Sequence, residues 1–175
     1  MKGILTVYIF FLFAFLSSRH GYAQEDKILY DQGIKNAKAG NFDFAFMNFN
    51  SLLETFPQSK YEENALFAVG EYYIINSNYR NAKEAFSRFV NDFPQAKAKL
   101  FAFAHLLDIA MREKNEKQSE KIKKQIATSQ QLSLLFSEYK VFKYSSPLSK
   151  RYKVIYYIDK IEFYLDDKLL KQISY

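Results

Sequence analysis

Apolar residues recur with a helical period in the middle of the chain. A first helix is indicated by apolar or small residues at i, i+3, i+4 and i+7, namely Leu66, Val69, Gly70 and Tyr73. After the turn-favouring residues 76–78, a second apolar helix face consists of Ala82, Phe86, Phe89 and Val90. Pro94 ends this second helix, because proline disfavours a helical conformation in the preceding residue. The pattern therefore predicts a helical hairpin over residues 63–97.

The same pattern occurs 37 residues earlier in the chain, over about residues 26–60. A shift by this period aligns residues of the same type: Gly33 with Gly70, Ala45 with Ala82, Phe49 with Phe86, and Pro57 with Pro94. A third unit starts after residue 97 but is degenerate. Leu107 stands at its glycine position, and Ser119 and Lys123 stand at its small and aromatic positions. Repetition at such a period is typical of stacked helical repeats.

These residues resemble the tetratricopeptide repeat, in which leucine, glycine, tyrosine, alanine, phenylalanine and proline recur at fixed spacings. The second copy matches with Leu66, Gly70, Tyr73, Ala82, Phe86 and Pro94. The first copy matches with Leu29, Gly33, Ala45, Phe49 and Pro57. The period and the Phe-Pro-Gln ends resemble the bacterial periplasmic proteins linked to Tol–Pal and to outer-membrane protein assembly. The resemblance implies an all-α array over residues 24–111 and a protein-binding rather than catalytic role.

Residues 112–175 are expected to form a degenerate repeat and a basic, helical C-terminal cap. An apolar face predicts a packing helix over 131–144, and such a helix can cap a repeat array. After Pro147, apolar residues spaced by three or four favour another helix: Val154, Ile158, Ile161, Leu165, Leu169 and Ile173. The alternative is a terminal β-hairpin, with strands at 161–165 and 169–173, because this stretch is rich in aromatic and β-branched residues.

The first 23 residues are predicted to be a signal peptide. Lys2 is followed by an uncharged apolar run over residues 4–16, and Gly21-Tyr22-Ala23 suits signal peptidase. The run is shorter than the ~20 residues that cross a bilayer, which favours a cleaved signal. The expectation is an exported, periplasmic protein. The sequence has no cysteine, so it offers no acceptor for a lipid anchor.

The composition leaves little material for catalysis. There is no cysteine, and His105 is the one histidine after residue 23. His105 lies in an apolar helical stretch, where a structural role is expected. Thiolate or histidine metal sites and histidine-based triads are therefore not predicted, and no cofactor is expected. The chain is predicted not to be an enzyme.

Charge is unevenly distributed along the chain. Residues 24–111 carry 9 basic and 11 acidic side chains, whereas residues 112–175 carry 14 and 8. A basic C-terminal half suits an acidic partner or peripheral contact with an anionic envelope surface, although a solvated lysine-rich face is the simpler interpretation. Nucleic acid is not expected, because acidic residues interleave with the basic ones and because the chain is expected to be exported.

The resemblance implies that the first helix of each repeat lines a concave, partner-binding face. The candidate residues for docking a peptide or helix of an envelope protein are Tyr30, Ile34, Phe67, Glu71, Ile74 and Ile75. The alternative is that the chain's own C-terminal helices fill this face. In that case a homo-oligomeric structural protein is the second hypothesis.

Overall fold

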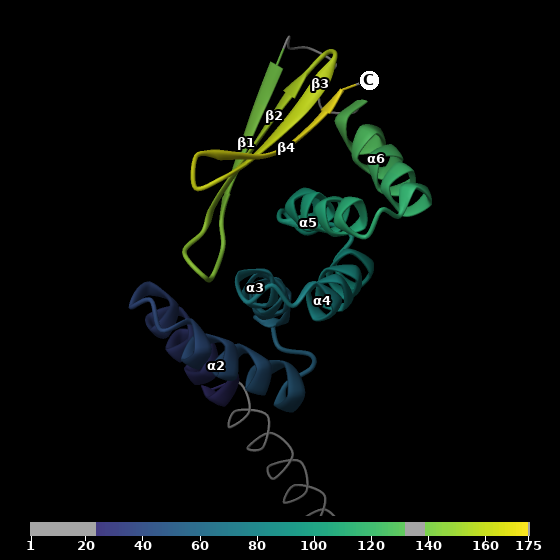
Figure 1. Ribbon diagram of the computed structural model, residues 1–175. Helices are drawn as coiled ribbons and strands as arrows, with labels where there is room; N and C mark the ends of the chain where they lie inside the picture. Colours follow the sequence, from purple (N-terminus) through teal and green to yellow (C-terminus); the bar gives the residue numbers. More distant parts are fainter. Residues whose placement is uncertain (1–23, 132–138, 175) are drawn as a thin grey trace, which may run out of the picture.

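The computed structural model describes residues 24–131 and 139–174, in which helices come first and strands last (Figure 1). A helix over residues 24–38 precedes α2 (Phe42–Thr55), α3 (Glu62–Ile75), α4 (Tyr79–Asp92), α5 (Lys99–Arg112) and α6 (Glu116–Gln131). The strands are β1 (Tyr139–Ser145), β2 (Arg151–Tyr157), β3 (Lys160–Leu165) and β4 (Lys168–Ser174). The predicted signal peptide lies outside the described residues.

The 37-residue period of the sequence is also the period of the helices. α2, α4 and α6 start at residues 42, 79 and 116, and α3 and α5 start at residues 62 and 99. Each hairpin turn holds one residue with positive φ at the same place: Gly40, Ser77 and Lys114. The degenerate third unit therefore forms a hairpin like the other two, although it lacks their glycine and phenylalanine.

The repeat glycines make room for an aromatic ring from the paired helix. A Cβ atom on Gly70 would lie 2.8 Å from the Phe86 ring, and one on Gly33 would lie 2.6 Å from the Phe49 ring. Both rings are fully buried. The space left by each glycine is therefore filled by an aromatic side chain of the next helix.

The third hairpin fills the same space from the other helix. Leu107, at the glycine position, is fully buried, whereas Lys123, at the aromatic position, is half-buried and pairs with Glu120. Ser119 keeps the small position and is buried like Ala45 and Ala82. The loss of the glycine and the loss of the phenylalanine thus compensate each other, because one bulky side chain per hairpin suffices.

The four strands form one antiparallel sheet in the order β1-β2-β3-β4. Along β2 the alternate residues Tyr152, Val154 and Tyr156 are buried, and they face the helices together with Ile161 and Phe163 of β3. The β3–β4 turn contains Asp166 and Asp167, both with positive φ, as in the tight turns of β-hairpins. The sheet lies to one side of the helical array in Figure 1.

The prediction of an all-α fold with C-terminal capping helices is wrong for this region. The predicted packing helix over 131–144 is replaced by the end of α6 and by β1, with residues 132–138 outside the described ones. The predicted last helix is replaced by β2, β3 and β4, so the hairpin alternative is confirmed. Apolar residues four apart fit a strand as well as a helix, because four is a multiple of the strand period of two.

Within residues 24–131 and 139–174, every helix is too short or too polar to cross a membrane. The core is continuous from the first hairpin to the sheet, because residues of the helices and of β2 and β3 belong to one buried cluster.

Candidate protein-binding site

The β1–β2 hairpin covers part of the predicted concave face. Phe67 of α3 has no exposed surface, and its ring meets Tyr144 and Tyr152 edge-on at centroid distances of 5.4 and 5.6 Å. Phe101 of α5 packs on the same two tyrosines at 5.9 and 5.0 Å. The turn between the strands is buried as well, since Leu148 is 1% exposed. Aromatic side chains of the sheet therefore occupy the centre of the face.

A buried chain of polar groups joins the helices to the sheet beside these rings. The Tyr152 hydroxyl donates to Glu71 Oε1 of α3 at 2.7 Å, and His105 Nε2 of α5 lies 2.8 Å from the same hydroxyl oxygen. Because that hydroxyl uses its hydrogen on Glu71, His105 must donate to it through a protonated Nε2. His105 also stacks on Phe86 at 4.8 Å. The histidine is thus structural, and its side chain is buried.

Burial keeps these titratable groups uncharged. It raises the pKa of Glu71 to about 8, although the Tyr152 and Ser146 hydroxyls and the Lys150 ammonium favour the carboxylate. Burial also lowers the pKa of His105 to about 4 and raises the pKa of Tyr152 well above its usual value. Glu71 Oε2 has no hydrogen-bond partner of normal geometry among the described residues. A neutral carboxylic acid is the form that tolerates this environment.

The six candidate docking residues fall into three groups by their exposure in the structure. Phe67 and Glu71 are buried against the sheet, whereas Ile75 is 43% exposed. Three others are half-buried: Tyr30, Ile34 and Ile74. Tyr30 stacks on Tyr61 at 4.4 Å, so part of its ring is used within the array. The part of the predicted site that a partner can reach is therefore the edge of the concave face, because the sheet covers its centre.

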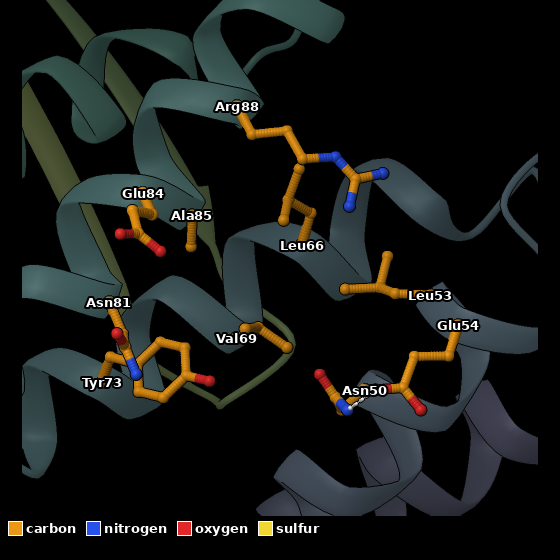
Figure 2. Close-up of a pocket in the computed structure, with 10 residues that line it drawn as sticks. All are labelled: Asn50, Leu53, Glu54, Leu66, Val69, Tyr73, Asn81, Glu84, Ala85 and Arg88. Atoms are coloured by element: carbon orange, nitrogen blue, oxygen red, sulfur yellow. Dashed lines mark hydrogen bonds between the residues drawn. The ribbon is translucent and has the colours of Figure 1, made fainter.

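A hollow that the sequence did not indicate lies on another side of α3. It measures about 340 Å³ and is lined by α2, α3 and α4 (Figure 2). Val69 and Tyr73 line it, and each lies about 200° around the helix from Phe67 or Glu71, two residues away. Leu53, Leu66 and Ala85 add apolar surface.

Polar side chains at this hollow are paired with neighbouring groups. The Asn50 amide donates to Glu54 at 2.7 Å, and Arg88 bridges Asp92 at 3.1 Å and Glu62. These polar positions belong to faces that read as solvent-exposed in the sequence. The hollow could therefore not be predicted from the sequence, because its shape depends on the spacing between α2 and α4.

No group of three or more metal-binding side chains occurs among residues 24–131 and 139–174. Within the same described ranges, the buried titratable groups that contact one another are Glu71, His105 and Tyr152, and the sheet covers them.

A comparison with protein families matches residues 22–160 to the YfiO family, described as outer membrane lipoprotein. The chain belongs to the YfiO family. The match spans the helical array and continues through β2, so the hairpin that covers the concave face lies inside the matched region. It supports the outer-membrane-assembly side of the resemblance and not the Tol–Pal link specifically. No curated protein matches the chain.

The YfiO-family description and the sequence differ in one respect. The family is described as a lipoprotein, whereas these 175 residues contain no cysteine to carry a lipid. Membership still implies an exported protein of the cell envelope.

Proposed function

We propose that this YfiO-family chain is a non-catalytic protein-binding scaffold of the bacterial cell envelope that acts in outer-membrane protein assembly. The observation that carries the proposal is the family match over a stack of helical hairpins. Such arrays present extended surfaces to other proteins, because each repeat contacts only its neighbours and leaves its remaining faces open. The periplasm is the proposed compartment, and the partner is a protein or peptide of the envelope.

The partner is proposed to dock on the open edge of the concave face. Ile75 is exposed there, and Ile34 and Ile74 are half-buried. Phe67 and Glu71 support this edge from below through their contacts with the sheet and do not touch the partner themselves.

Affinity capture from native envelopes tests the assignment. The chain with Ile75→Asp should lose its captured partners, because a charge would be placed in an apolar contact. Ile28→Asp is the matched control, since Ile28 is 46% exposed on the helix over residues 24–38, away from the docking edge. If a folded Ile75→Asp chain captured the same partners as the control, the docking edge would be assigned wrongly.

A second candidate function is a self-associating structural protein of the envelope. The filled centre of the concave face favours it, because the chain's own tyrosines take the place of a ligand. Phe44 and Met47 of α2 are 61% and 59% exposed and offer an apolar surface for self-association. Light scattering over a range of concentrations separates the two. A concentration-dependent dimer that Phe44→Asp dissociates would support self-association, and a monomer throughout would exclude it.

A further inference from the structure

The outer face of the sheet carries a row of residues that crosses all four strands. Lys143 of β1 lies opposite Lys153 of β2, Lys153 opposite Tyr164 of β3, and Tyr164 opposite Leu169 of β4. The row points away from the helices, because the alternate residue Tyr152 is buried on the inner face. We call these four residues the lysine row.

Two like charges face each other at the start of the lysine row. A directly opposed pair of lysines is unfavourable in an antiparallel sheet. Among the described residues no carboxylate lies within ion-pair distance of Lys143 or Lys153, and Lys153 instead lies over the Tyr164 ring at 4.2 Å. Glu162 of β3 already accepts hydrogen bonds from Lys160 and Tyr164, each at 2.8 Å, and Asp166 and Asp167 pair with Lys150 and Arg151. The row therefore presents uncompensated positive charge.

Apolar side chains accompany this charge. Val141 and Leu169 are 41% and 55% exposed on the outer face, and Ile158 is 77% exposed at the β2–β3 turn. The sheet region 139–174 contains eight lysine and arginine residues and four aspartate and glutamate residues, a net charge of +4. Lysine, tyrosine and exposed aliphatic residues on one surface are the combination that suits a membrane interface.

We propose that the outer face of the sheet, centred on the lysine row, binds the surface of an anionic lipid bilayer. The lysine ammonium groups meet the lipid phosphates, which relieves the repulsion between Lys143 and Lys153. The exposed aliphatic side chains enter the headgroup region, where they leave water. A bilayer surface offers phosphates and an apolar layer side by side, so it matches the lysines and the exposed aliphatic side chains together. The surface is separate from the docking edge at Ile75, so both can be occupied together.

Co-sedimentation with vesicles tests the proposal. The chain, expressed for export so that its N-terminal segment is processed, should bind vesicles of phosphatidylglycerol and phosphatidylcholine much better than vesicles of phosphatidylcholine alone. Each lysine at an anionic surface contributes about fivefold in partitioning. The double variant Lys143→Gln, Lys153→Gln should therefore bind roughly 25-fold more weakly. High salt should also release the wild-type chain, because it screens charges at the surface.

A matched control distinguishes an effect of the lysine row from an effect of the net charge of the chain. Lys117 and Lys121 are exposed on α6, and Lys117→Gln, Lys121→Gln removes the same charge from another surface. The proposal requires the control to bind like the wild type. Equal losses in both double variants would show a net-charge effect and overturn it, as would equal binding to both kinds of vesicle.

An optical reporter tests the orientation independently. The sequence contains no tryptophan, so a single Ile158→Trp substitution provides a unique fluorophore. Its emission should shift to the blue on anionic vesicles, whereas Met47→Trp on α2 should not shift. A shift at Met47→Trp alone would place another face on the membrane. Binding of polyglutamate, with no binding of vesicles, would identify an acidic polypeptide as the ligand and refute the lipid proposal. None of these outcomes bears on capture through Ile75.

Discussion

The Tyr152 hydroxyl donates a 2.7 Å hydrogen bond to Glu71 Oε1, which links the sheet to the second helical hairpin across 81 residues of chain. His105 meets the same hydroxyl from the third hairpin at 2.8 Å. Both contacts are buried, and they lie beside the rings that the sheet packs on Phe67. The sheet is therefore held to the array by specific contacts and by apolar burial together.

Stability should fall between about pH 6.5 and 8. Burial raises the pKa of Glu71 from an ordinary 4.5 to about 8. The stabilisation that results is complete below pH 4.5 and is lost as the pH rises through 8. The lowered pKa of His105, about 4, gives stability that is lost as the pH falls from 6.5 through 4. The two effects oppose each other below pH 6.5. The free energy of unfolding therefore falls mainly between pH 6.5 and 8, by on the order of 2 kcal/mol.

Glu71→Gln tests this pH dependence. Glutamine keeps an oxygen that accepts from Tyr152 but does not ionise, so urea unfolding of the variant should change little between pH 6.5 and 8. Glu54→Gln, at an exposed site on α2, is the control and should keep the wild-type slope. A Glu71→Gln chain as pH-dependent as the wild type would show that Glu71 is not the group responsible.

Gly70→Ala should destabilise the chain by about 1–3 kcal/mol, because an added methyl group overpacks a filled core. The new Cβ would lie 2.8 Å from the fully buried Phe86 ring. Thermal unfolding measures the loss. Adding Phe86→Leu to the variant should cost less than Phe86→Leu costs in the wild type, and strict additivity of the two changes would contradict the contact.

Lys114→Gly should stabilise the third hairpin by about 1 kcal/mol, because glycine adopts positive φ without the Cβ clash. Lys114 has φ of 54° at the position where Gly40 stands in the first hairpin. The comparison variant is Lys124→Gly within α6, which should lose about 1 kcal/mol of helix stability. Chemical denaturation of both distinguishes a local backbone effect from the loss of a lysine.

Lys143→Glu should stabilise the sheet by about 0.2–1 kcal/mol, since it converts a like-charge pair with Lys153 into an opposite-charge pair. The same substitution at Lys140, which lies opposite Tyr156, removes an equal charge without forming that pair. Unfolding at low salt should therefore rank Lys143→Glu above Lys140→Glu. The reverse ranking would mean that the β1–β2 register does not govern this pair.

The helical array was predictable because its signals are local. Gly33, Gly70, Phe49 and Phe86 mark helix contacts at fixed spacing, and the proline positions mark helix ends, so the period could be read directly. The third hairpin was harder, because Leu107 takes over the role of the missing phenylalanine from the other helix. The exchange keeps the space between the two helices filled but changes the residue types, so the repeat pattern no longer shows it.

The sheet and its contact with the helices were not predictable in the same way. All spacings but one in the stripe from Val154 to Ile173 are four residues, which fits both periods, so the choice depends on whether a surface exists to cover the strands. That surface is the centre of the concave face, and its pairing with Tyr144 and Tyr152 is a long-range property. Of the candidate docking residues, the sequence could place Phe67 and Ile75 on one face but could not tell which of them the chain itself would cover.

Photo-crosslinking from position 144 tests most directly that the chain's own sheet fills the concave face. A benzophenone amino acid replaces Tyr144, whose ring lies 5.4 Å from Phe67 and 5.9 Å from Phe101. Irradiation of the dilute protein, followed by mass spectrometry, should give intramolecular links from β1 to peptides of α3 and α5. Links from this position to other proteins, with none to α3 or α5, would contradict the account.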